Sequence, residues 1–232
     1  MRLRPGEVEA AGWRVVPLGE VVRRLVGGGG SAVEVGVRPT ADGPSGAHQP
    51  GLVPRPVIVG IDGRGGAGKS ALAERLHHAV PRSWVVHTDD IAWNQAYFDW
   101  AGLLTENVLR PLHRGEAVEF RPPAWVAHDR PGAVVVPAGA DVVWVEGTGV
   151  VRAELGPWLD ASVWVQGDLD EQERRLVARD GDSPEQQRHV AAWLAEEVPF
   201  LEREQPWLRA AVVVNGTPEL PHDPATEIVV AA

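Results

Sequence analysis

The sequence predicts a three-layer α/β fold in which a five-stranded, mostly parallel sheet has helices on both faces and carries a small lid. Two observations predict it. Five short apolar runs alternate with helical patterns, and the first run leads directly into a glycine-rich loop. Strands that are apolar throughout are typical of a parallel sheet buried on both faces. The five runs lie at 56–61, 84–87, 141–145, 161–165 and 210–214.

The glycine-rich loop after the first run has the spacing G-x-x-x-x-G-K-S. The chain has 22 lysines and arginines, and Lys69 in this loop is the single lysine among them. A compact ammonium can lie between the β- and γ-phosphates of a nucleotide, whereas an arginine fork is planar and bulky. We therefore expect a phosphate-binding site. Its residues are Gly63, Gly65, Gly66, Ala67, Gly68, Lys69, Ser70 and Ala71.

The segment after the loop supports this interpretation. Residues 70–76 have a helical pattern in which Leu72 and Leu76 share one face. The order of strand, glycine loop and helix directs backbone N–H groups and the helix N-terminus at the phosphates. The Ser70 hydroxyl is then placed to ligate magnesium. The sequence thus predicts a P-loop NTPase fold that uses ATP and Mg²⁺.

Composition argues against several other classes of protein. The net charge of −10, without an arginine stripe, argues against a nucleic-acid polymer as partner. No apolar run approaches the roughly 20 residues of a membrane span, and residues 1–26 lack the apolar centre of a signal peptide. Cysteine is absent, which excludes disulfides and thiolate metal sites. We expect a cytoplasmic protein, and its oligomeric state, homo-oligomers included, stays open.

Composition also divides the chain into segments. Residues 27–55 are rich in Gly, Pro, Ser and Ala, which is typical of a flexible linker, and the alternating runs begin only after them. The expected segments are an N-terminal strand and helix at 1–26, the linker at 27–55, the P-loop domain at 56–217 and a C-terminal tail at 218–232.

Three shorter stretches have patterns of their own. Residues 13–16 predict a short strand, and residues 18–26 predict a helix with Val21, Val22 and Leu25 as its apolar positions. The proline-rich stretch 118–136 ends in a short apolar run. It predicts an inserted hairpin that lies over the site.

Two aspartates, Asp89 and Asp90, come directly after the second apolar run. Ligands of a doubly wound sheet gather at the carboxyl ends of its strands, so both carboxylates should point toward the γ-phosphate. Asp89 is the candidate general base for a substrate hydroxyl, and it could also hold magnesium directly or through water. Asp90 either caps a helix that begins near Ile91 or supports the site, and it is a weaker candidate for substrate contact.

Glu146 directly follows the third apolar run. A carboxylate at this strand end occupies a Walker-B-like position and can complete the magnesium shell with Ser70. Gly147 lets the chain turn away sharply behind it. The alternative is a strand-end carboxylate in solvent.

Arg175 and Arg179 follow the fourth apolar run and are four positions apart, so they share one face of a predicted helix. Two guanidinium groups on one face suit a lid that closes over a transferring phosphate. The alternative is a surface helix in which Glu171 pairs with Arg175.

These four elements, in this order and spacing, resemble the uridine kinase-like branch of the P-loop nucleoside and small-molecule kinases, in particular its actinobacterial-type members. In that family the aspartate after the second strand is the general base, which implies this role for Asp89. The glutamate at the strand end belongs to the magnesium shell, as Glu146 would here. An Arg-Asp pair ends the lid helix, where this chain has Arg179 and Asp180. The resemblance covers 57–217 and implies a kinase domain.

The resemblance is weaker at the acceptor pocket. Uridine kinases carry an aromatic residue soon after the catalytic aspartate in a D-x-F-Y motif, where this chain has Ile91, Ala92 and Trp93. They also place a Tyr-Asp pair before a histidine in the hairpin, and here only an aromatic residue, Trp125, and a histidine, His128, correspond. Both tryptophans are candidates for stacking on a substrate, and His128 is a candidate for contact with a substrate hydroxyl or base.

The sequence predicts magnesium-dependent transfer of the γ-phosphoryl group of ATP to a hydroxyl of a small molecule, with a nucleoside such as uridine or cytidine as the first choice. Lys69, Asp89, Arg175 and Arg179 are the expected catalytic residues. Two alternatives stay open. One is a phosphotransferase for an antibiotic or other secondary metabolite, and the other is a nucleotide-binding regulatory protein without catalysis, which would need neither base nor lid.

Overall fold

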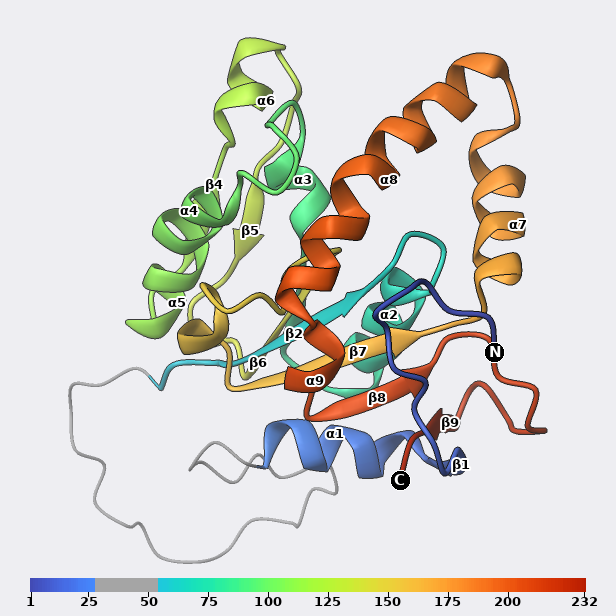
Figure 1. The fold of residues 1–232 in the computed structure, drawn as a ribbon. Helices are drawn as coiled ribbons and strands as arrows, with labels where there is room; N and C mark the ends of the chain where they lie inside the picture. The colour runs from blue at the N-terminus through green and yellow to red at the C-terminus, as the bar shows by residue number, and fades with distance from the viewer. Residues whose placement is uncertain (28–53) are drawn as a thin grey trace, which may run out of the picture.

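The computed structural model describes residues 1–27 and 54–232, so the linker expected at 27–55 lies almost wholly outside the described residues. Its centre is a seven-stranded sheet with the order β1-β9-β8-β7-β2-β6-β3 (Figure 1). The five strands from β8 to β3 are parallel, which confirms the predicted sheet. The seven strands are β1 (Arg14–Pro17), β2 (Val57–Gly63), β3 (Ser83–His87), β6 (Val142–Glu146), β7 (Ala161–Gln166), β8 (Val212–Asn215) and β9 (Glu227–Val230).

Strand β2 is the middle one of the five parallel strands and is buried along its whole length. Side chains alternate between the two faces of a strand. Val59 and Ile61 accordingly pack in the hydrophobic cluster on one face, and Ile58 packs in the cluster on the other. Burial on both faces explains why this strand is apolar throughout rather than alternating with polar residues.

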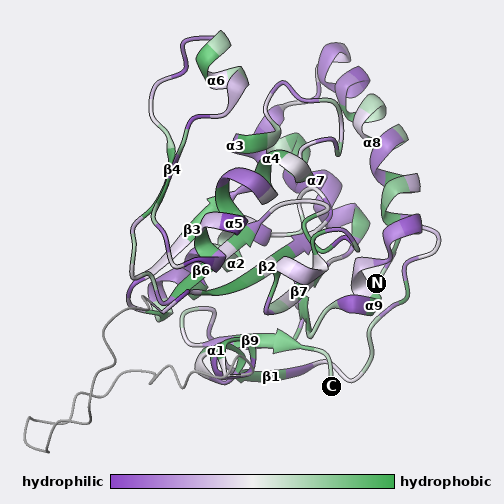
Figure 2. Cartoon of the chain, turned by 90° about the vertical axis from the view of Figure 1, so that its left-hand side faces the viewer, coloured by the Kyte–Doolittle hydropathy of each residue, from purple (hydrophilic) through white to green (hydrophobic). Residues whose placement is uncertain are grey.

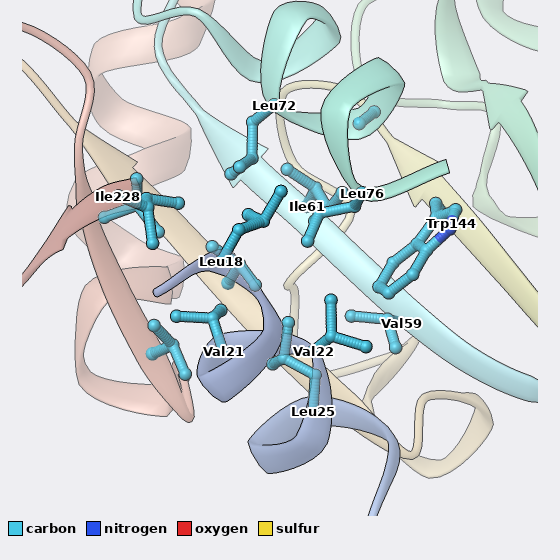
Figure 3. Packing of buried hydrophobic residues seen from close by; sticks show 14 of the residues in the cluster. Leu18, Val21, Val22, Leu25, Val59, Ile61, Leu72, Leu76, Trp144 and Ile228 are labelled. Atoms are coloured by element: carbon cyan, nitrogen blue, oxygen red, sulfur yellow. The ribbon is translucent and has the colours of Figure 1, made fainter. Parts of the chain in front are cut away.

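One face of the sheet is covered by α1 (Leu18–Val26) and α2 (Lys69–Ala79). The helix predicted at 18–26 has these same bounds. Figure 3 shows Val21, Val22 and Leu25 of α1 pointing toward the strand residues and toward Leu76 of α2. These apolar side chains recur at helical spacing and form one buried face. Because a helix this short is marginal on its own, packing of that face on the sheet stabilises it.

The opposite face is covered by short helical segments whose leucines and valines pack on β6 and β2. These segments are α3 (Thr88–Ala92), α4 (Ala101–Leu104), η1 (Thr105–Leu109), α5 (Arg110–His113) and η2 (Gly156–Trp158). Helices therefore lie on both faces of the sheet, as the three-layer prediction requires. Figure 2 shows the hydrophobic strands enclosed between them.

Both ends of the chain join the sheet. Strand β9, within the 218–232 segment expected as a tail, pairs antiparallel with β8 and with β1. The residues before β1 cross to the start of the segment after β7, where the Leu169 N–H donates to the Arg2 carbonyl and the Ala10 N–H donates to the Gln166 side chain. The N-terminal extension thus packs along the sheet instead of trailing from it.

A hairpin forms at 118–136, as expected, and it projects from the body of the protein (Figures 1 and 2). The expectation that it lies over the site is not met, because no described residue of 118–136 lines the cavity that Lys69 and Asp89 share. Strands β4 (Val118–Phe120) and β5 (Val134–Val136) pair antiparallel, and α6 (Pro123–Ala127) lies at the tip between them. We call β4, α6 and β5 the arm. Helices α7 (Leu169–Asp180) and α8 (Pro184–Glu204) rise above the sheet opposite the arm, on the right in Figure 1. The short helix α9 (Pro206–Arg209) follows α8.

Within the part of the chain that the structure describes, no helix combines the length and the apolar character needed to cross a membrane.

Candidate active site

The glycine-rich loop joins β2 to α2 at the centre of the sheet, and α7 packs directly against it. Gly66 has a φ of 73°, and a Cβ at this position would lie 2.6 Å from the Gln172 carbonyl oxygen of α7. Only glycine tolerates this combination of backbone angle and close approach. The first N–H groups of α2 have no partner within the helix, so they are available to an anion in the loop.

The Lys69 ammonium is held at the mouth of this loop. Its Nζ donates to the Arg64 carbonyl at 3.0 Å and to the Thr148 hydroxyl at 3.1 Å, and that hydroxyl donates to the Gly63 carbonyl at 3.0 Å. Thr148 was not predicted as a site residue. The signal for it was its place two residues after Glu146, at the end of a strand adjacent to β2.

Glu146 and Ser70 come together as predicted. The Ser70 hydroxyl donates to Glu146 Oε1 at 3.2 Å, and His87 Nδ1 contacts the same oxygen at 2.5 Å. His87 was missed, although it ends β3 and is the register partner of Glu146 on the neighbouring parallel strand. A gap of 59 positions separates them in sequence, so only the sheet order reveals the pair.

The charges around Glu146 favour its ionised form. Burial alone would raise the pKa of the Glu146 carboxyl, but the hydrogen bond from His87 and the positive charge of Lys69 hold that pKa below its ordinary value. The same hydrogen bond raises the pKa of His87. The site therefore presents a carboxylate and a hydroxyl to a hard cation such as magnesium.

Asp62 is a buried carboxylate that the sequence analysis missed. Its oxygens accept the N–H groups of Gly63, Gly149 and Val151 at 2.7 to 2.8 Å, so it ties the start of the glycine-rich loop to the turn after β6. Burial raises the pKa of Asp62 to about 6. The signal for it was a charged residue directly after the apolar run 56–61, before the first glycine of the loop.

Gly147 makes the turn after Glu146. It has a φ of 152°, and a Cβ there would lie 1.7 Å from the Thr88 hydroxyl oxygen. The close packing of these two loops brings the start of α3, and with it Asp89, to the same cavity as Lys69 and Glu146.

Lys69 and Asp89 line one cavity of about 850 Å³. Its wall also includes Ser70, Glu146 and both predicted lid arginines. Asp89 is exposed to the cavity from α3, whereas Glu146 lies buried at the end of β6. The Lys69 ammonium and the Asp89 carboxylate, on which the hypothesis of phosphoryl transfer depends, therefore face the same cavity.

Asp90 does not cap a helix that begins near Ile91, because α3 begins at Thr88 and makes Asp90 an interior position. Its carboxylate instead accepts a hydrogen bond from Arg130 Nη2 of the arm at 2.6 Å. The Trp125 indole N–H donates to the Asp90 carbonyl at 2.8 Å. Asp90 thus joins α3 to the arm. No role was predicted for Arg130, because it stands in an irregular stretch 40 residues from Asp90.

The aromatic candidates for substrate contact gather around Arg130, where Trp125 and His128 belong to the arm and Trp93 directly follows α3. The Arg130 guanidinium lies 3.7 Å from the Trp125 ring centroid and 5.4 Å from that of Trp93, and Trp93 meets His128 edge to face at 5.4 Å. Among the described residues, those lining the cavity include Asp89 but none of these three candidates. The opposite wall is formed by α8, from which His189, Val190 and Trp193 face the cavity.

Both lid arginines line the cavity from α7. Arg175 donates to Glu171 at 2.8 Å, the pairing expected for a surface helix, and also to the Gly216 carbonyl at 2.9 Å. Arg179 makes a two-pronged contact with Asp180, which raises the pKa of Arg179. Arg175 is thereby anchored near the phosphate loop, while Arg179 is exposed and stands nearer the end of the helix.

The donor set fits a nucleotide with magnesium. Within residues 1–27 and 54–232 no group of three or more His, Asp or Glu side chains is arranged to hold a metal. Magnesium in nucleotide sites is commonly bound by one or two protein oxygens, with phosphates and water completing its octahedron. Ser70 and Glu146, 3.2 Å apart beside the glycine-rich loop, supply such a pair.

Comparisons with known proteins give likeness to solved structures only. No protein-family model and no curated protein matches the chain. A possible uridine kinase from Bacillus stearothermophilus is 22% identical with a TM-score of 0.48, over 69% of this chain and 89% of that one. A fructose transport system kinase, so named provisionally, from Silicibacter sp. TM1040 is 22% identical with a TM-score of 0.46, over 68% of this chain and 87% of that one. At this similarity the function has to be inferred from the site itself.

Proposed function

We propose that the protein is an ATP-dependent kinase that transfers the γ-phosphoryl group to a hydroxyl of a small molecule. The observation that carries the proposal is that the Lys69 ammonium and the Asp89 carboxylate line one cavity. Ser70 and Glu146 line the same cavity. A protein that only binds nucleotide needs the Lys69 ammonium and not the Asp89 carboxylate.

On the donor side, the amides of the glycine-rich loop and the Lys69 ammonium bind the phosphates of ATP. Ser70 and Glu146 hold the magnesium ion, which when bound neutralises charge on the β- and γ-phosphate oxygens. The lowered pKa of Glu146 keeps this ligand ionised across the neutral range. Arg175 and Arg179 face the same cavity and add positive charge as the γ-phosphoryl group leaves ADP.

On the acceptor side, Asp89 accepts the proton of the attacking hydroxyl. The acceptor oxygen forms a bond to the γ-phosphorus while the bond from that phosphorus to the β,γ-bridging oxygen breaks, and ADP carries the electron pair away. Little covalent chemistry is asked of the protein, so its contribution is position and charge. Asp89 suits this role because it is exposed in the cavity and bears no ion pair within 4 Å among the described residues.

For the acceptor we propose a nucleoside such as uridine or cytidine. The acceptor end of the cavity offers Trp193 of α8, an aromatic ring on which a planar base can stack. A second candidate is an antibiotic or other secondary metabolite. This candidate is favoured by a difference from uridine kinases at the arm. The aromatic rings there pack on Arg130, and the cavity wall is formed by α8 instead.

A coupled assay of ADP release tests the proposal. Purified protein with Mg²⁺ and ATP is given uridine, cytidine and a panel of hydroxylated secondary metabolites, and the phosphorylated product is identified by mass. Acceptor-dependent ADP release with a phosphorylated nucleoside supports the first candidate, and a phosphorylated metabolite supports the second. ATP binding without transfer to any acceptor would instead indicate a regulatory nucleotide-binding protein.

A further inference from the structure

A carboxylate from α8 stands on the phosphate loop itself. Glu197 is only 2% exposed, and its Oε1 accepts the Gly65 N–H at 3.4 Å while its Oε2 lies 3.4 Å from Arg64 Nη1. Gly65 belongs to the loop whose N–H groups bind anions. An acidic side chain therefore occupies part of the surface that the phosphates of ATP are expected to use.

A second carboxylate holds the same arginine from the other side. Glu7 of the N-terminal segment accepts Arg64 Nε at 2.8 Å, and its other oxygen accepts the side-chain N–H groups of Trp164 and Gln166 at 3.0 and 3.1 Å. Every contact of Glu7 is shorter than either contact of Glu197. Glu7 is therefore the fixed partner of Arg64, and Glu197 is the weakly held one.

The contact of Glu197 lies at the β,γ-end of the phosphate site. Lys69 Nζ, which reaches the β- and γ-phosphates in loops of this kind, donates to the Arg64 carbonyl. That carbonyl and the Gly65 N–H belong to one peptide unit. Arg64 also has one buried nitrogen, Nη2, that finds no hydrogen-bond partner within the described residues. This nitrogen is a buried donor that is available to an incoming anion.

We propose that Glu197 is an internal anion that occupies the phosphate loop in the free protein and is displaced when ATP binds. The proposal rests on the proposed function, since it regulates the same nucleotide site. The terminal phosphates take over the Gly65 N–H and the spare Arg64 nitrogen, while Glu7 keeps Arg64 in place. A negative charge that must leave before a more negative ligand can enter lowers the affinity for ATP.

Helix α8 links the displacement of Glu197 to the part of the cavity proposed to bind the acceptor. His189, Trp193 and Glu197 are four positions apart, so they lie along one face of this helix, and all three line the cavity. Releasing Glu197 from the loop frees the segment of α8 that carries the acceptor wall. Binding of ATP thus changes the position of Trp193, which couples the two substrates.

The test is the ATP affinity of the Glu197→Gln variant, measured by calorimetry with Mg²⁺ on the full chain. Glutamine keeps the shape and one acceptor oxygen but removes the charge. We expect ATP to bind at least about fivefold more tightly, while the melting temperature of the free protein falls because the buried ion pair with Arg64 is lost. If Glu197 only stabilised the fold of the loop, the variant would lower both the ATP affinity and the melting temperature. Glu196→Gln, at an exposed neighbouring position of α8, and Glu7→Gln, on the same arginine, should not tighten ATP.

Unchanged or weaker ATP binding by Glu197→Gln, or equal tightening by Glu7→Gln, would overturn the proposal. Glu197→Asp provides a second variant, because its shorter side chain keeps the charge but cannot reach the Gly65 N–H, and it should also bind ATP more tightly than the wild type. Failure of the wild-type protein to bind ATP at all would refute the proposed function instead. Binding by the wild type without tightening in the variants would refute only the displacement.

Discussion

The phosphate end and the acceptor end of the cavity are built in different ways. At the phosphate end, Glu146 and His87 end the neighbouring strands β6 and β3, whose register is set by the sheet, and Lys69 begins the helix that follows β2 and its glycine-rich loop. At the acceptor end, the wall is formed by the face of α8 that carries His189, Val190 and Trp193, and no described residue of the arm lines the cavity. Strand ends hold reactive groups in a fixed geometry, whereas a helix face that lines a cavity can change its side chains and with them the specificity.

The largest effect is expected at the phosphate end. Replacing Lys69 by arginine keeps the charge but puts a planar fork where the compact ammonium contacts Arg64 O and Thr148. We expect a loss of turnover of about 100-fold or more, measured as steady-state ADP release with the acceptor that the assay of nucleosides and metabolites identifies.

The control for this prediction is Arg174→Lys, the reverse exchange at an exposed position of α7. It should leave turnover unchanged. Comparable activity in Lys69→Arg and the wild type would mean that any cation serves here, and that the phosphate end is less strictly fixed than the sheet register suggests.

Two tryptophans allow α8 and the cluster around Arg130 to be compared as surfaces for the acceptor. Trp193 lines the cavity from α8 and packs edge to face on Tyr97 at 5.4 Å, whereas Trp93, 37% exposed, belongs to the cluster around Arg130. We expect Trp193→Ala to raise the KM for the acceptor about tenfold through lost stacking, with the KM for ATP little changed.

The matched variant Trp93→Ala should leave the acceptor KM near the wild-type value. If Trp93→Ala raised it and Trp193→Ala did not, the arm would be the acceptor surface, and the sequence-based choice of Trp93, Trp125 and His128 would be preferred to the wall on α8.

A smaller effect concerns stability at the base of the phosphate loop. Because burial raises the pKa of Asp62 to about 6, against 3.8 for an ordinary aspartate, the folded protein binds this proton more tightly than the unfolded chain. Its contribution to the free energy of unfolding is therefore present at low pH and is lost as pH rises from about 4 through 6. The two pKa values correspond to about 3 kcal/mol across that window.

Denaturant unfolding between pH 4 and 7 measures this contribution. The Asp62→Asn variant should show a shallower fall in unfolding free energy over that range than the wild type. An unchanged slope in Asp62→Asn would show that Asp62 is ionised throughout.

Sequence reasoning succeeded where the local pattern determines the structure. The amphipathic spacing of Val21, Val22 and Leu25 predicted α1, and strand-end positions predicted that Ser70 and Glu146 meet. It failed where partners come from distant segments. Strand β9 is only four residues long and becomes a strand by pairing with β1 and β8, and Glu7 reaches Arg64 across 57 positions. No local periodicity carries such pairings.

The most direct test of the account is the Asp89→Asn variant, because the central claim is that an ammonium and a carboxylate act on the same phosphoryl group from one cavity. We expect ATP affinity to stay near the wild-type value, since Asp89 does not contact the phosphate loop, and single-turnover transfer to the acceptor to fall about 100- to 10,000-fold. Transfer at the wild-type rate by Asp89→Asn would contradict the account.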